Sequence, residues 1–396
     1  MSDTTAVNNT EKGKYTSGVV YKIIIAMTFL IAFGLIMVAS TSKVQEVSEN
    51  FREHVIYIGI GIALVFFCVY VPYGWYKKLA WVAYGISVIL TACLMNRSWG
   101  IEVNGATRWL KFPGLPQFQV ADVVKTCMII FIAAYISSKW REMDKFKTII
   151  ILWLVVGAEA VFLYKVSNNL SSALVVLGIC YLCTFITSKN WKLHLVVLIL
   201  FLLVAAGLIG YVVTHLPTQD ELKNDDNNFR FGRIIGWLYT DRYELDEGYQ
   251  VKQSLYAIGS GSLLGKGLGS GTQKLENIPE AQNDMIFAIV CEELGLVGAI
   301  LLFLMYGYLI YQLYVIVKES TNVFGSVLVI GTMVHFICQI IINVCVATNL
   351  FPNTGVSLPF ISSGGSALIT TMIECGICIG VRSQQKKRMY QKHLAE

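Results

Sequence analysis

The chain has 396 residues, of which 55% are hydrophobic and 14% are charged, and its formal net charge is +5. Soluble domains carry roughly 25% charged residues, so this composition excludes an ordinary soluble protein and indicates a membrane protein. The small positive charge gives no indication of nucleic-acid binding. The length suffices for about ten spans of ~20 residues with their loops.

Apolar stretches predict ten helices in chain order. The first 18 residues are polar, and the apolar run after them is long enough to span rather than to act as a cleavable signal. The predicted helices cover residues 19–41, 54–72, 79–96, 121–138, 148–164, 170–187, 193–214, 285–317, 324–348 and 360–381. We therefore expect an all-α integral membrane protein with one polytopic domain over 19–381, a large loop at 215–283 between helices 7 and 8, and a basic tail at 382–396.

Ten spans place both termini on one side of the membrane, and the positive charge indicates which side. The short segments on the side of the termini hold 17 Lys and Arg residues, whereas the short opposite loops hold 6. Positive charge is enriched in cytoplasmic loops. The sequence therefore predicts a multi-pass protein of the cytoplasmic membrane with both termini in the cytoplasm and residues 215–283 outside. The basic tail can bind anionic lipid, but we expect it mainly to fix the topology.

Neither the cysteines nor the glycines indicate a known cofactor site. All ten cysteines lie in apolar stretches, and the CxxC pairs Cys180/Cys183 and Cys375/Cys378 have no nearby histidine, so we interpret them as small packing residues. The glycine-rich part of the large loop lacks the GxxxxGK[ST] pattern of a phosphate-binding loop. It is predicted to form a small amphipathic or re-entrant helix at the outer surface.

Polar residues interrupt several of the predicted helices. Asp122 and Lys125 are spaced i, i+3 on one helical face, where they can pair. His335, Gln339 and Asn343 recur every four residues and form a polar stripe. Both sets have a structural alternative: the first is then only an ion pair, and the second only joins neighbouring helices by hydrogen bonds.

Acidic residues mark the eighth predicted helix. Asp284 lies at its outer edge, and Glu292 and Glu293 lie ~12 Å further along the axis at 1.5 Å per residue. Glu159 and Glu374 add two more intramembrane acids. Such groups usually face a bundle interior or a wet cavity, so we expect an internal polar cavity open to the outside. The structural alternatives are that Asp284 is a helix N-cap and that Glu292 and Glu293 are paired structural groups. On these residues alone, an enzyme and a transporter remain equally possible.

Four ordered motifs give the chain a family resemblance. They are "NGATRWL" at 104–110, "QVADVVK" at 119–125, the stretch 248–295 from "GYQVKQSLYAIGSGS" to "NDMIFAIVCEELG", and "TGVSLPFISSGGS" at 354–366. Together they resemble the shape, elongation, division and sporulation family of bacterial cell-wall proteins, whose members include RodA, FtsW and SpoVE. The similarity covers essentially the whole membrane region.

The chain departs from the family pattern at a few positions. Val120 and Ala121 stand where the family has Pro and Ser, Asn169 replaces an acid, and Ser363 replaces a Tyr. The change at Asn169 weakens any expectation of a charge there. The motifs do not distinguish the elongation, division and sporulation branches.

The resemblance implies polymerisation of lipid II into β-1,4 glycan strands at the outer membrane face. The donor is an α-linked pyrophosphate and the product is a β-linkage, so one inverting displacement with one general base suffices. The resemblance makes Asp284 that base. It implies that Lys125 stabilises the leaving pyrophosphate, with Arg108 and Arg233 as weaker candidates. Asp122 is expected to orient Lys125. It also places Gln253, Ser362 and Gly364 at the substrate.

The resemblance also bears on cofactors and partners. A divalent cation such as Mg²⁺ can share the pyrophosphate-binding role, although the sequence does not require one. The implied protein partner is a class B penicillin-binding protein, a single-span transpeptidase, because the stretches "SSGG" and "SGSG" lack the SxxK spacing of a crosslinking serine. Two alternatives are a lipid II flippase and a non-catalytic scaffold of the cell-wall machinery.

Overall fold

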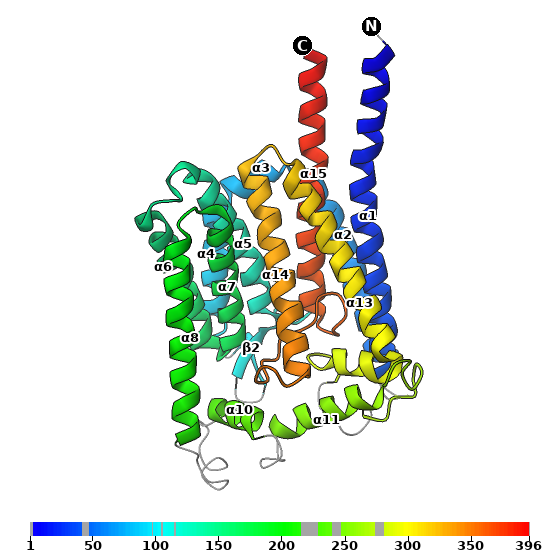
Figure 1. The fold of residues 1–396 in the computed structure, drawn as a ribbon, viewed down its shortest axis with the longest axis vertical. Coiled ribbons are helices and arrows are strands. Elements are labelled where there is room, and N and C mark those ends of the chain that lie inside the picture. The colour runs from blue at the N-terminus through cyan, green and yellow to red at the C-terminus, as the bar shows by residue number, and fades with distance from the viewer. Residues whose placement is uncertain are drawn as a thin grey trace.

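A computed structural model describes residues 3–41, 47–96, 98–103, 106–114, 116–214, 229–239, 247–273 and 281–395. The acidic start of the large loop, part of the "NGA" motif and residues 274–280 therefore lie outside the described residues, as do the side chains of the basic tail from residue 386. The described chain is a bundle of long helices with both termini at one end (Figure 1).

The bundle begins with two long helices and a bent third element. Helices α1 (Asp3–Thr41) and α2 (Val47–Tyr70) are followed by the short α3 (Tyr73–Lys78) and by α4 (Ala80–Cys93). At 1.5 Å per residue, the 14 residues of α4 extend only about 21 Å. The predicted third span at 79–96 therefore exists but is shorter than expected, because the chain turns at residues 94–96 and enters a small sheet.

That sheet is antiparallel and lies at the end of the molecule opposite the termini (Figure 1). Strand β2 (Ala106–Leu110) pairs with β1 (Gly100–Val103) on one side and with β3 (Phe118–Gln119) on the other. Helix α5 (Val120–Ser138) begins directly after β3. The sheet therefore fixes where α5 starts, and the buried first two turns of α5 carry Asp122 and Lys125.

Four spans follow from α5 onward. After α5 and a short 3-10 helix at Trp140–Glu142 come α6 (Phe146–Ser167), α7 (Leu170–Thr187) and α8 (Trp191–Thr214). Asn169 is the N-cap of α7, and its side chain accepts a hydrogen bond from the Ser172 backbone N–H at 3.0 Å. The amide oxygen of Asn169 thus accepts the capping hydrogen bond at a position where the family pattern has an acidic residue.

The large loop contains two helices that lie crosswise to the bundle. Helices α10 (Phe229–Leu238) and α11 (Glu247–Ser260) cross the end opposite the termini (Figure 1). The helix predicted for the glycine-rich stretch is wrong from Gly261 onward, where the chain forms turns, and the helical part, α11, ends at Ser260. The chain then continues through α13 (Ile286–Glu319), α14 (Val323–Ala347) and α15 (Gly365–Ala395).

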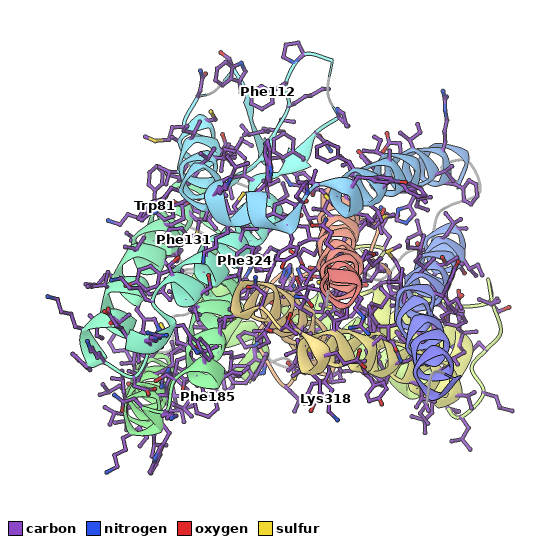
Figure 2. All side chains as sticks on the ribbon, turned by 90° about the horizontal axis from the view of Figure 1, so that it is seen from above. Trp81, Phe112, Phe131, Phe185, Lys318 and Phe324 are labelled. Atoms are coloured by element: carbon purple, nitrogen blue, oxygen red, sulfur yellow. The ribbon has the colours of Figure 1, made fainter. Side chains whose placement is uncertain are left out.

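Helix α15 forms the centre of the bundle. It packs against α2, α1, α5 and α14, and the view along the bundle shows it surrounded by other helices (Figure 2). The ring of Phe131 on α5 lies 5.0 Å from the rings of both Trp81 and Tyr84 on α4, and Figure 2 shows Trp81 and Phe131 side by side. Helix α8 is at the other extreme, since only His194 and Val212 are buried in it.

The architecture confirms the predicted fold class. Within the described residues, nine helices are long and apolar enough to cross a membrane, and the shorter Ala80–Cys93 is the tenth apolar helix. Only helices and closed barrels satisfy their backbone hydrogen bonds within lipid, which is why ten apolar runs become ten helices. The chain is a multi-pass membrane protein.

Candidate active site

The strongest candidate, Asp284, lies immediately before α13 at the end opposite the termini. Figure 1 shows this end of α13 beside α11, against which it packs. The N-cap of α13 is Met285, and its side chain makes no capping hydrogen bond. The alternative in which Asp284 is the N-cap is therefore wrong. Asp284 is half-buried, whereas Met285 and the residues that follow it are buried.

The main chain of Asp284 is held by Asn343 of α14. The Asn343 Nδ2 group donates to Asp284 O at 2.7 Å and to Val356 O at 2.8 Å. Asn343 is 1% exposed, so these bonds replace water at a buried amide. One side chain thereby joins α14, the start of α13 and the loop that contains the "TGVSLPF" motif.

The carboxylate of Asp284 faces that same loop. A Cβ placed on Gly355 would lie 3.8 Å from Asp284 Oδ2, and Gly355 is exposed. On the other side, Gln250 Nε2 of α11 lies 3.5 Å from Asp284 Oδ1. The carboxylate therefore sits between a half-buried amide and an exposed residue without a side chain, where a polar group from outside can approach it.

The predicted pair of Asp122 and Lys125 is confirmed. Lys125 Nζ lies 2.8 Å from Asp122 Oδ1, and both side chains are buried. Ser366 of α15 donates from Oγ to Asp122 Oδ2 at 2.8 Å. The aspartate thus has a cation on one oxygen and a hydroxyl on the other, so the ammonium group is fixed in the first turns of α5.

A second buried cluster joins three helices nearer the middle of the bundle. The Glu374 carboxylate of α15 accepts from Thr126 Oγ1 at 2.7 Å, and His335 Nδ1 lies 2.9 Å from Glu374 Oε2. Of the predicted stripe on α14, His335 therefore bonds the neighbouring helix α15, whereas Asn343 bonds the main chain of Asp284 and Val356. Glu159 is also buried and accepts from Thr91 Oγ1 at 3.0 Å.

Glu292 and Glu293 have structural partners. Glu292 Oε1 accepts from Lys266 Nζ at 2.7 Å and from the Thr272 N–H at 2.9 Å. The Ser40 hydroxyl of α1 lies 2.8 and 2.7 Å from the two oxygens of Glu293. The two acids therefore fasten the glycine-rich turns and α1 to α13, which is the structural role that the alternative interpretation gave them.

The remaining predicted residues occupy the same end of the molecule. Arg108 lies on β2, Arg233 on α10 and Gln253 on α11, and all three are half-buried. Ser362 is buried, and its hydroxyl accepts from the Leu358 N–H at 2.7 Å, while Gly364 directly precedes α15. Their substrate contacts, like the predicted polar cavity, stay predictions.

The residues that sequence reasoning missed are amides. Gln250 and Asn353 lie in or beside the matched motifs, but neither carries a charge or a helical spacing that indicates a contact with Asp284. Asn343 was noted only as part of a stripe. The signal that was available is position: Gln250 follows "GY" at the start of the longest motif, and Asn353 directly precedes "TG".

The described residues do not form a cluster typical of a resident metal. Among them, no three His, Cys, Asp or Glu side chains come together as they would around an ion. The ten cysteines are free and buried or half-buried. A divalent cation that arrives with a pyrophosphate substrate therefore stays a prediction.

The chain is similar in sequence to known proteins of one family. Residues 21–387 match the family model for FtsW, RodA and SpoVE, described as cell cycle protein. The chain is 30% identical over 365 residues to stage V sporulation protein E of Bacillus subtilis, covering 91% of this chain and 95% of that protein. It is also 30% identical over 370 residues to the probable peptidoglycan glycosyltransferase FtsW of Coxiella burnetii, again covering 91% and 95%.

Solved structures show the same fold. A chain from a peptidoglycan synthase complex that coordinates polymerization and crosslinking matches with a TM-score of 0.74 and 23% identity, covering 92% of this chain and 98% of that one. The rod shape determining protein RodA of Thermus thermophilus matches with a TM-score of 0.62 and 21% identity, covering 92% and 97%. The matched family model, the similar sequences and the shared fold agree, and the chain belongs to the FtsW, RodA and SpoVE family.

Proposed function

We propose that this protein is a peptidoglycan glycosyltransferase that polymerises lipid II at the outer face of the cytoplasmic membrane. The observation that carries the proposal is the placement of Asp284. It is a half-buried carboxylate outside the helix cap, fixed through its main chain by Asn343 and bordered by the exposed Gly355. The relative from Coxiella burnetii carries the same activity in its name.

The reaction is a single displacement at the anomeric carbon of the donor. Asp284 accepts the proton of the acceptor 4-hydroxyl while that oxygen forms the new C1–O bond. The C1–O bond to pyrophosphate breaks on the opposite face, so the α-linked donor gives a β-linked product. The isoprenoid pyrophosphate leaves with the bonding electrons and needs positive charge rather than a proton, and the ammonium group of Lys125 is the first candidate for its source.

The direct test uses Asp284→Asn in the full-length protein, purified in detergent and supplied with lipid II. General-base catalysis contributes roughly 10²–10⁴-fold, so we expect polymer formation to fall by at least about 100-fold. Glu142→Gln is the matched control, since Glu142 is an acid on the 3-10 helix after α5 whose side chain is 44% exposed, and it should retain full activity. Wild-type polymer yield from a well-folded Asp284→Asn protein would remove the assignment.

The same assay separates the alternatives. A flippase or a scaffold does not polymerise lipid II in detergent, where there are no membrane sides. We further infer that a class B penicillin-binding protein docks beside the bundle and crosslinks the strands. The chain of similar fold from a complex that coordinates polymerization and crosslinking supports this inference. Adding a candidate transpeptidase to the lipid II assay should yield crosslinked strands.

A further inference from the structure

A chain of amide hydrogen bonds leads from the loop backbone to the Asp284 carboxylate. It begins at the Gly355 N–H, which donates to Asn353 Oδ1 at 3.2 Å. Asn353 Nδ2 donates to Gln250 Oε1 at 2.7 Å. Gln250 Nε2 then faces Asp284 Oδ1 at 3.5 Å. Asn353 is buried, and Gln250 is half-buried.

The order of these contacts fixes the direction of both amides. A backbone N–H is always a donor, so the group of Asn353 that faces Gly355 is its oxygen. The NH₂ group of Asn353 therefore faces Gln250, whose nearest atom must be an acceptor. The only end of Gln250 left for Asp284 is its NH₂ group, and the carboxylate consequently meets a donor rather than a carbonyl oxygen.

We propose that Asn353 and Gln250 are positioning residues for the Asp284 base. Asn353 sets the direction of the Gln250 amide, and Gln250 holds the carboxylate in its orientation. The inference rests on the proposed function. The physical reason is that an N–H donor favours the charged form of a carboxylate, whereas a carbonyl oxygen turned towards it repels it.

The long 3.5 Å contact is consistent with this role. Hydrogen bonds of catalytic groups are often long before substrate binds and shorten in the complex. The 2.7 Å bond between Asn353 and Gln250 is short by comparison. The strong bond therefore fixes the orientation, and the weak one leaves the carboxylate able to move towards the acceptor hydroxyl.

The test compares Asn353→Asp, Gln250→Leu and the double variant in the lipid II assay, with kcat and KM measured separately. An ionised Asp at position 353 accepts only, so Gln250 should turn its NH₂ group to it and present Oε1 to Asp284. We expect kcat to fall about tenfold or more in each single variant while KM stays within about twofold, because neither residue contacts substrate. Asn353→Asp should cause no further loss in the Gln250→Leu background, since it acts through Gln250.

A further variant and a control distinguish a loss of catalysis from a loss of folding. Gln250→Glu preserves shape and keeps the bond from Asn353, but it places a carboxylate oxygen against Asp284, and we expect it to lose at least as much kcat as Gln250→Leu. Gln339→Met alters another buried amide, on α14, and should behave as wild type.

Three results would overturn the proposal: full kcat in Asn353→Asp, independent multiplying losses in the double variant, or an effect on KM alone. The absence of polymer from the wild-type protein would instead remove the proposed function, and with it the base that these residues serve.

Discussion

At the scale of single residues, the buried charges of this protein are paired across short distances. Lys125 and Asp122 are 5% and 3% exposed in their side chains and 2.8 Å apart. Removing one partner of a buried ion pair leaves an uncompensated charge and costs roughly 3–5 kcal/mol, whereas removing both is often nearly neutral. The pair thus serves the stability of α5 as well as the proposed binding of pyrophosphate.

Lys125→Met should therefore lower the thermal unfolding midpoint more than the double change Asp122→Asn with Lys125→Met. In the single variant, the Asp122 carboxylate keeps only the Ser366 hydroxyl; in the double variant no charge is left in the site. Both variants should lose activity, since both lack the proposed cation. If Lys125→Met unfolds at the wild-type temperature, the pair does not carry the stability ascribed to it.

At the scale of elements, α13 is two helices joined at a break. Its 34 residues would extend about 51 Å as one helix, well beyond a hydrocarbon core of about 30 Å. At Gly295 the backbone has φ 65° and ψ −162°, a region that essentially only glycine adopts. The spanning part therefore begins at residue 296, and the first part, which carries Glu292 and Glu293, packs against the glycine-rich turns.

Those turns satisfy the backbone groups that the break leaves open. The N–H groups of Lys266 and Gly267 donate to the carbonyls of Glu292 and Glu293 at 2.9 and 3.0 Å. The N–H groups of Leu296 and Val297 donate to Ser262 O and Leu263 O, both at 3.1 Å. The glycine-rich motif thus completes a broken helix.

Gly295→Ala should strongly destabilise the protein. A Cβ there would lie 2.4 Å from Gly265 N and 2.5 Å from Leu263 O, which are backbone atoms of the turns just described, and the dihedral angles are strained for alanine. Gly307→Ala is the control in the same helix: its Cβ meets open space, and alanine favours a helix by up to about 1 kcal/mol. Thermal unfolding monitored by tryptophan fluorescence measures the effect. Equal unfolding midpoints for the two variants would contradict this account.

At the scale of the whole molecule, the termini lie at one end, and the sheet, α10 and α11 lie at the other (Figure 1). Asp284 precedes α13, which packs against α11. Positive charge in the short loops predicts that the end with the termini is cytoplasmic. The proposed reaction needs the opposite end to face outside, because the donor and acceptor sugars of lipid II are polymerised there.

Cysteine labelling in spheroplasts checks this orientation. Lys111→Cys lies next to the sheet and Arg141→Cys on the 3-10 helix after α5, and both positions are exposed, while the native cysteines are buried or half-buried. A membrane-impermeant maleimide should label Lys111→Cys in intact spheroplasts and Arg141→Cys only after lysis. The reverse pattern would invert the topology and remove Asp284 from the outer face.

The sequence by itself determined the spans and the local pairs. An apolar run of about 20 residues becomes a helix in lipid whatever surrounds it, so ten spans were predictable. Asp122 and Lys125 share a helical face by spacing alone, and the motifs placed Asp284 at an edge. These features depend on residues close together in the chain.

Only the tertiary structure decided which distant groups meet. Ser366 binds Asp122 across 244 positions, Ser40 binds Glu293 across 253, and Asn353 reaches Gln250 across 103. No periodicity encodes such contacts, because they arise when separate helices and loops pack. The break at Gly295 is also a tertiary feature. A glycine within an apolar run is compatible with a continuous helix, and only the packed glycine-rich turns show that the helix is broken there.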